Sequence, residues 1–152
     1  MLPKTHFIFG LIFALFVLYL FPQIGLFGAG IIFLSSFLID FDHYLFYVIM
    51  EKDFSLKKAY NWHLIKRQKM RKLSKIERNK HKNEIIFLHG VEPLIILFLL
   101  SFLYFPFLYV IIGFSFHLIM DIFEEIREGH RIDKISVIWD IVKYKKLKKL
   151  TI

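Results

Sequence analysis

The chain alternates between long apolar stretches and short charged ones. Lys, Arg, Asp and Glu are absent from Thr5–Ile39 and again from Pro93–Met120. About 20 apolar residues are enough for a helix to cross the hydrocarbon core of a bilayer. The pattern therefore predicts four membrane-spanning segments, at about 7–27, 28–48, 85–103 and 106–125.

Each of these segments is expected to be helical, because a helix satisfies its own backbone donors and acceptors where water is absent. Pro22 and the Gly28–Gly30 run mark the first turn, and Pro106 marks a tight return between the last two segments. The prediction is an all-α integral membrane protein: a four-helix transmembrane bundle that forms a single domain over residues 1–152. A cleaved signal peptide is the alternative interpretation of the first segment, whose apolar stretch is long for a signal.

The distribution of charged residues indicates how the chain is oriented in the membrane. The chain is 57% hydrophobic and has a net charge of +8, and twelve of its 21 Lys and Arg lie between Glu51 and Asn83, with eight more after Asp121. The positive-inside rule then places both termini and the loop 51–84 in the cytoplasm, as in a multi-pass protein of the plasma membrane. The basic charge is explained without nucleic acid, and a nucleic-acid partner for the Lys66–Lys82 run is the less favoured interpretation.

The charged loop 51–84 and the tail 127–152 are predicted to contain amphipathic helices that lie at the membrane interface, with basic side chains facing anionic headgroups. At 100° per residue, each has apolar side chains within a narrow arc. In the loop and in the tail respectively, these are Trp62, Ile65, Leu73 and Ile76, and Ile132, Ile135, Trp139 and Val142.

The positions that carry chemistry are ionisable residues inside or beside the apolar segments. Such residues cost at least a few kcal/mol each in a membrane, so they usually face one another or a functional cavity. At about 1.5 Å of rise per residue, all of them fall in the cytoplasmic half of the bilayer. They are His6, Asp40, Asp42, His43, His89, Glu92, His117 and Asp121.

The spacing of these residues favours a metal site. Asp40 and His43 are three residues apart and His117 and Asp121 are four apart, so each pair shares a helix face. Helix bundles build metal centres from inward-facing carboxylate and histidine pairs on different helices. Nitrogen and oxygen donors without cysteine suit a divalent ion, zinc first with manganese or iron as alternatives, as one or two ions. The predicted ligands are His6, Asp40, His43, His89, His117 and Asp121.

Two further carboxylates, Asp42 and Glu92, are the candidates for orienting or deprotonating a water molecule. On a regular helix Asp42 points away from Asp40, so it either supports the site from behind or reaches it if the helix opens. Glu92 shares a helix face with His89, and Pro93 removes a backbone hydrogen bond there, which predicts a distorted helix beside the site.

Bis-histidine haem is the alternative chemistry for histidines on facing helices, and the carboxylates argue against it. Three other histidines lie in basic, polar surroundings and receive no functional assignment. They are His63, His81 and His130.

Three short motifs, in order along the chain, carry a family resemblance: Thr5-His6-x-x-x-Gly10, Asp40-Phe41-Asp42-His43 and Gly113-x-x-x-His117-x-x-x-Asp121. In these motifs the chain resembles the YdjM-like family of inner-membrane metal-dependent hydrolases. The middle of the chain differs from the family pattern. Many members have His-Arg followed by Thr-His-Ser where this chain has Leu88-His89-Gly90-Val91-Glu92. The resemblance implies a helical membrane protein with a divalent metal site and hydrolase activity. A more distant similarity to zinc-dependent phospholipase C enzymes implies phosphoester substrates.

The leading hypothesis is a membrane-embedded hydrolase in which metal-activated water attacks a phosphoester or similar amphiphilic substrate, such as a lipid, at the cytoplasmic interface. The expected partners are membrane lipids and that substrate. Gly28, Gly30, Ser35 and Ser36 would permit close helix packing, so a homo-oligomer is an open alternative.

The alternative is a non-catalytic membrane protein whose metal or polar cluster is structural, or which handles ions or protons. The almost entirely apolar stretches Pro93–Leu103 and Phe107–Gly113 disfavour a path through the membrane. A membrane adaptor that binds a partner through its basic loop is a third hypothesis.

Overall fold

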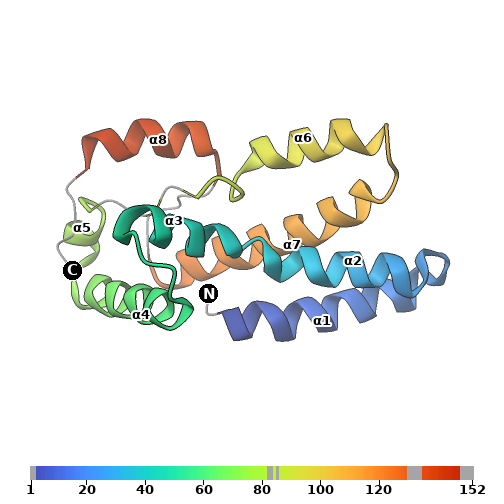
Figure 1. The fold of residues 1–152 in the computed structure, drawn as a ribbon, viewed down its shortest axis with the longest axis horizontal. Coiled ribbons are helices and arrows are strands. Elements are labelled where there is room, and N and C mark those ends of the chain that lie inside the picture. The colour runs from blue at the N-terminus through green and yellow to red at the C-terminus, as the bar shows by residue number, and fades with distance from the viewer. Residues whose placement is uncertain (1–2, 82–83, 85, 130–134, 148–152) are drawn as a thin grey trace.

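The computed structural model describes residues 3–81, 84, 86–129 and 135–147, and the regular structure in these ranges is helical, as predicted (Figure 1). The elements are α1 (Pro3–Leu20), η1 (Pro22–Ile24), α2 (Gly25–Leu38), α3 (Phe41–Glu51), α4 (Leu56–Lys72), α5 (Lys75–Arg78), α6 (Val91–Ser101), α7 (Phe107–Arg127) and α8 (Val137–Lys146).

Three stretches are long and apolar enough to cross a membrane: Pro3–Leu20, Pro22–Glu51 and Phe107–Arg127. The second of these combines η1, α2 and α3. Their length and composition indicate a membrane protein.

The predicted segment 85–103 is shorter in the structure. Residues 86–90 are not helical, residue 85 lies outside the described residues, and α6 has 11 residues. A helix of that length rises about 16 Å, about half of a bilayer core. Pro93 lies in the first turn of α6, where its missing N–H leaves no hydrogen bond unmade. The four-helix transmembrane bundle therefore stays a prediction.

The first turn lies earlier than the sequence indicated. It is formed by η1, which begins at Pro22, and by Gly25, whose φ of 63° is readily adopted only by glycine. The Gly28–Gly30 run is helical and belongs to α2. The second turn is where it was predicted, because Pro106 directly precedes α7.

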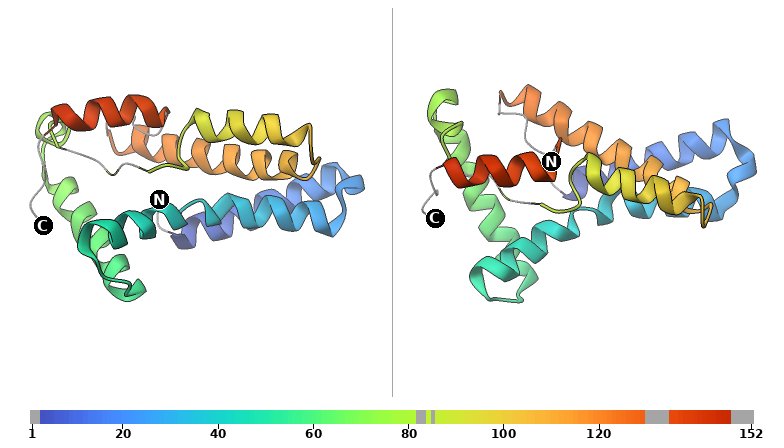
Figure 2. Two further views of the ribbon diagram at one scale, coloured as in Figure 1. Left: turned by 45° about the horizontal axis from the view of Figure 1, so that its top comes forward. Right: turned by 90° about the horizontal axis from the view of Figure 1, so that it is seen from above.

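The molecule is elongated, with α1, α2 and α6 at one end and α3, α4, α5 and α8 at the other, and α7 runs from the first end toward the second (Figures 1 and 2). α2 packs against both α1 and α7, and α6 runs along α7. Small residues allow these close approaches: a Cβ at Gly113 of α7 would collide with Ser35 and with the backbone of α2, and one at Gly10 of α1 would collide with Ser36.

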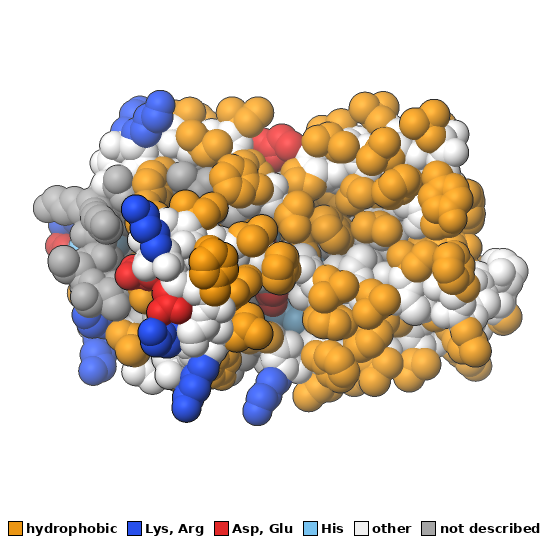
Figure 3. Space-filling model, in the orientation of Figure 1, with side chains coloured by type: hydrophobic (Ala, Val, Ile, Leu, Met, Phe, Trp, Pro, Cys, Tyr) orange, Lys and Arg blue, Asp and Glu red, His pale blue; other side chains and the backbone are white. Residues whose placement is uncertain are grey.

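Several ionisable side chains are buried in this protein, and many large apolar ones are exposed. His6, His117 and Asp121 are buried, whereas apolar side chains such as Leu15 on α1 and Leu99 on α6 are more than half exposed. Figure 3 shows apolar side chains over the end that holds α1, α2 and α6, while Lys and Arg gather toward the other end. So large an exposed apolar surface is unusual in a soluble protein and suits a lipid environment.

The amphipathic segments differ in detail from their prediction. In the loop, α4 ends at Lys72 and α5 begins at Lys75, so the arc that was expected to include Leu73 and Ile76 is interrupted. The tail forms α8, which leaves apolar side chains exposed. These are Ile138, Trp139 and Val142. Ile132, Lys148 and Lys149 lie outside the described residues.

Candidate metal centre

A break between two helices positions the first ligands. α2 ends at Leu38 and α3 begins at Phe41. The Asp40 N–H donates to Phe37 O, three residues back, instead of continuing the α-helical pattern. The carbonyl of Ser36, one turn before Asp40, accepts a hydrogen bond from His117 Nδ1 at 2.8 Å. The helix is therefore interrupted at Asp40, so Asp40 and Asp42 do not have the relative orientation of one regular helix.

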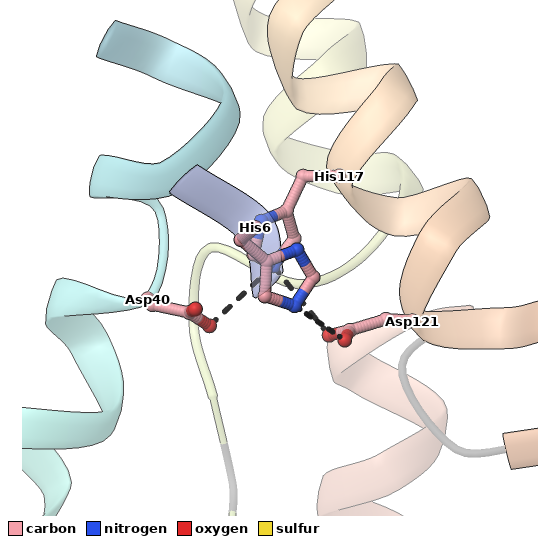
Figure 4. Close-up of side chains that lie close together, drawn as sticks. All are labelled: His6, Asp40, His117 and Asp121. Atoms are coloured by element: carbon pink, nitrogen blue, oxygen red, sulfur yellow. Dashed lines mark ion pairs between the residues drawn. The ribbon is translucent and has the colours of Figure 1, made fainter. Parts of the chain in front are cut away.

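Four side chains from three separate parts of the chain meet in the interior (Figure 4). His6 comes from α1, Asp40 from the break between α2 and α3, and His117 and Asp121 from α7. Each residue offers one ligand atom, and these four atoms all lie within 4.8 Å of one another. The group could therefore hold a metal ion. The rings of His6 and His117 stack with centroids 4.0 Å apart.

His89 and His43 extend this cluster. Asp40, His43 and His89 form a second group that could hold a metal ion, and Asp40 is common to both groups. Asp40 Oδ1 lies 3.4 Å from His117 Nε2, 3.6 Å from His43 Nε2 and 3.7 Å from His89 Nε2. Asp121 Oδ2 lies 3.4 Å from His89 Nε2 and 3.5 Å from His117 Nε2. The Nε2 atoms of His89 and His117 thus face both carboxylates, and that of His43 faces Asp40.

The other ring nitrogen of each of these histidines contacts a hydrogen-bond acceptor. His117 Nδ1 contacts the Ser36 carbonyl, and His89 Nδ1 lies 3.1 Å from Asp42 Oδ2. A carbonyl or carboxylate oxygen can only accept, so the proton of each ring belongs on Nδ1 and the Nε2 lone pair faces the cluster. This is how outer partners orient histidine ligands in metal sites.

The donor set fits a divalent ion. Ligand atoms at the bond lengths of zinc are about 3.0–3.4 Å apart in regular coordination, and the contacts of His89 Nε2 have similar lengths, from 3.0 Å to His117 Nε2 to 3.7 Å to Asp40 Oδ1. Within the described residues, three buried polar atoms of the cluster and its surroundings make no hydrogen bond: His6 Nε2, Asp40 Oδ2 and Asp42 Oδ1. His6 Nε2 is 3.2 Å from Asp121 Oδ1, but the two are not aligned as donor and acceptor.

Charge favours a cation in the same place. The basic groups that contact Asp40 are the rings of His43, His89 and His117. Neutral rings leave the negative charge of buried carboxylates uncompensated, which is energetically costly away from water. A divalent ion would compensate that charge and would accept the Nε2 lone pairs.

The structure brings together all of the predicted metal ligands, which are His6, Asp40, His43, His89, His117 and Asp121.

Asp42 lies behind His89, where its Oδ2 also accepts from Leu88 N–H at 2.9 Å. Asp40 and Asp42 therefore contact opposite ends of the His89 imidazole ring.

Glu92 lies elsewhere. His89 precedes α6 rather than belonging to it, so His89 and Glu92 do not share a helix face. The Glu92 carboxylate accepts from Ser136 Oγ at 2.6 Å and from the N–H groups of Val137 and Ile138 at 3.0 and 3.2 Å. It thereby caps the N-terminus of α8.

Two residues beside the site, His63 and Glu84, were not predicted from the sequence. Together with His43 they form a third group that could hold a metal ion. The available signal was weak: Glu84 is the one acidic residue between Glu77 and Glu92, directly before an apolar segment. His81 is not part of these groups, and His130 lies outside the described residues.

Glu84 is kept ionised by its neighbours. Burial alone would raise the pKa of its carboxyl, but the Lys66 ammonium and hydrogen bonds from His43 and His63 lower that pKa well below its ordinary value. An ionised Glu84 accepts from His43 Nδ1 at 2.6 Å. His43 therefore also directs Nε2 toward Asp40.

A second charge cluster joins the loop to the end of α7. Arg67 pairs with Glu124 and Glu128, and Arg71 pairs with Glu128. Burial opposes ionisation of Glu128, but the two guanidinium groups lower its pKa to about 2. These pairs hold α4 beside the helix that carries His117.

Comparison with protein-family models, curated proteins and solved structures gives no match. The candidate centre is accordingly defined by its own geometry.

Proposed function

We propose that this chain is a membrane-embedded, metal-dependent hydrolase of the kind that the YdjM-like resemblance implies. The observation that carries the proposal is the convergence of the Nε2 atoms of His89 and His117 on two carboxylates, Asp40 and Asp121, with His43 Nε2 also facing Asp40. In a zinc or related divalent site these donors would hold the ion. The bound ion would polarise a substrate oxygen and make water nucleophilic near neutral pH.

The supporting residues have separate tasks in this proposal. Asp42 orients His89, because its carboxylate contacts Nδ1 from outside the cluster. The carbonyl of Ser36 does the same for His117. Rigid outer contacts of this kind keep the ligands in place when a substrate binds, which is a requirement for effective catalysis.

Exposure indicates the side from which a substrate would approach. The side chains of His6, His89, His117 and Asp121 are at most 2% exposed, whereas those of Asp40 and His43 are 16% and 26% exposed. A substrate would therefore reach the centre past the start of α3. Asp40 and His43 lie between the apolar end of the molecule and the end that carries the charged helices, so an amphiphilic phosphoester such as a lipid is the substrate class that we favour.

The proposed setting is the plasma membrane, with both termini and the loop 51–84 on the cytoplasmic side. The supporting observation is the segregation of Lys and Arg into the loop and tail. Anionic headgroups of that leaflet would attract α4 and α8.

Metal analysis of detergent-purified protein tests the proposal. We expect stoichiometric zinc, manganese or iron, and we expect it to be lost in the double variant His117→Ala and Asp121→Ala. A matched control is Glu77→Ala with Lys80→Ala, which removes an exposed ion pair of α5. The absence of bound metal from the wild-type protein, or its retention by the double variant, would refute the proposal.

Turnover separates catalysis from a structural role. A panel of soluble phosphoesters and phospholipids, assayed with added zinc or manganese, should reveal hydrolysis that a chelator abolishes. Tightly bound metal without turnover of any compound in the panel would instead favour the non-catalytic alternative.

A further inference from the structure

Glu84 lies at the edge of the candidate metal centre and contacts three groups. Its Oε2 is 2.6 Å from His43 Nδ1, and its Oε1 is 3.1 Å from His63 Nδ1 and 3.2 Å from Lys66 Nζ. The Glu84 side chain is 12% exposed. One largely buried carboxylate thus connects a ligand on α3 with two residues on α4.

Glu84, His43 and His63 satisfy the distance criterion for a metal site, but the Lys66 ammonium and the His43 Nδ1–H already contact the Glu84 carboxylate and disfavour an ion there. The Lys66 ammonium already supplies positive charge to Oε1, and it lies over the rings of Phe46 and Trp62, with 5.6 and 5.0 Å to the centroids.

The Nε2 atom of His63 also has a hydrogen-bond partner. Its Nε2 lies 3.1 Å from the carbonyl oxygen of His43, and because a carbonyl can only accept, this nitrogen carries a proton. His63 therefore holds the backbone of His43 through Nε2, and its Nδ1 lies beside the Glu84 carboxylate. These contacts leave orientation of the His43 ring as the task of Glu84.

We propose that Glu84 is a positioning residue of the metal centre: it accepts the Nδ1 proton of His43 and so directs His43 Nε2 toward Asp40. The Lys66 ammonium holds the carboxylate in that position. This inference rests on the metal centre of the proposed function. It repeats on a second ligand the arrangement of Asp42 behind His89, in which an outer carboxylate sets the tautomer and the orientation of a ligand ring.

The consequence concerns the charged loop 51–84. From sequence alone the loop is a basic anchor at the membrane surface, but Glu84 and α4 support the most exposed ligand of the centre from outside. His43 is 26% exposed, so it has fewer packing contacts than the buried ligands to hold its ring in place. Its orientation therefore depends more on the hydrogen bond to Glu84.

The test compares two variants of Glu84 with two matched variants of Glu77, an exposed glutamate of the same loop. Divalent-ion affinity is measured on the full-length detergent-purified protein by competition with a chromophoric chelator, using zinc. The absorption spectrum of the cobalt-loaded protein reports on the ligand geometry. Glu84→Ala should weaken zinc binding about 10- to 100-fold, as loss of an outer carboxylate does, and should alter the cobalt spectrum.

Glu84→Gln should keep the affinity and the spectrum close to those of the wild type, because its amide oxygen still accepts from His43 Nδ1. Glu77→Ala and Glu77→Gln should change neither. If Glu84→Ala does not fold, Glu84→Met replaces it, since Met fills a similar volume without an acceptor and should weaken binding in the same way.

Three outcomes would overturn the inference. Unchanged zinc affinity in Glu84→Ala or Glu84→Met would refute the positioning role and leave the proposed function standing. Loss of one bound ion per chain in His63→Ala would show that the third group is itself an ion position. A wild-type protein without stoichiometric metal would refute both the inference and the proposed function.

Discussion

The Nε2 atoms of His89 and His117 lie 3.0 Å apart in the interior of the protein. Each ring has its Nδ1 against an acceptor, Asp42 for His89 and the Ser36 carbonyl for His117. Two lone pairs at this distance repel each other unless a positive charge lies between them. That charge is either a proton on one of the rings or a metal cation, and the carboxylates around both Nε2 atoms favour the cation.

The orientation of His89 should depend on Asp42. Asp42→Ala removes the acceptor for both His89 Nδ1 and Leu88 N–H, so we expect metal affinity to fall about 10- to 100-fold and stability to fall by about 1–3 kcal/mol. Asp42→Asn keeps one acceptor oxygen and should have the smaller effect on both quantities. Chelator competition and thermal unfolding in detergent measure them.

The same variants distinguish the two roles predicted for Asp42. If Asp42 acts as a base toward water, Asp42→Asn should lower turnover while metal content remains. If it only orients His89, turnover should follow metal occupancy. Asp42→Ala with wild-type metal affinity would contradict the orienting role.

Close packing of α7 against α2 should be needed for the centre to form. A Cβ at Gly113 would meet Ser35 Oγ and the Ile32 carbonyl, whereas one at Gly30, also in an apolar helix, would meet nothing within 4 Å. We expect Gly113→Ala to destabilise the protein by about 1–3 kcal/mol and to weaken metal binding, because it separates His117 from Ser36. Gly30→Ala is the matched control and should be neutral. Thermal unfolding and metal content of the two variants test this, and equal behaviour would contradict it.

Glu92 should hold α8 against the start of α6. Glu92→Ala removes the acceptor for Ser136 Oγ and for two N–H groups of α8, so we expect faster proteolysis within α8 with no change in metal content. Ser136→Ala should have a weaker effect of the same kind. If Glu92→Ala instead abolishes turnover while α8 stays protected, the catalytic role predicted from the sequence would be supported.

The ion pairs of Glu128 should make stability depend on pH in the acid range. The pKa of Glu128 is lowered from 4.5 to about 2 in the folded protein. The stabilisation is therefore fully present above pH 4.5 and is lost as the pH falls toward 2. We expect Glu128→Gln to lower stability by about 1 kcal/mol at neutral pH, with a difference from the wild type that shrinks below pH 4.5. A difference that stays constant down to pH 2, measured by thermal unfolding, would contradict this.

The apolar stretches, the separation of charge and the identity of the candidate ligands are properties of the sequence by itself. Charge-free runs long enough to cross a bilayer allow few structures other than helices. His6, Asp40 and His117 stand out within them because ionisable groups are rare in apolar surroundings. The helical class and the candidate metal ligands could therefore be predicted without coordinates, although the extent of α6 could not.

The tertiary structure decided how these residues meet. The break between α2 and α3 places Asp40 and Asp42 at opposite ends of the His89 ring, which a regular helix would not do. Glu84 contacts a histidine 41 residues away, and Glu92 caps a helix 45 residues further along. Local periodicity carries no information about contacts at such separations, because they depend on how the helices pack. The sequence by itself determined which side chains could bind a metal; only the packing decided which nitrogen of each histidine faces it, and which carboxylates stand behind.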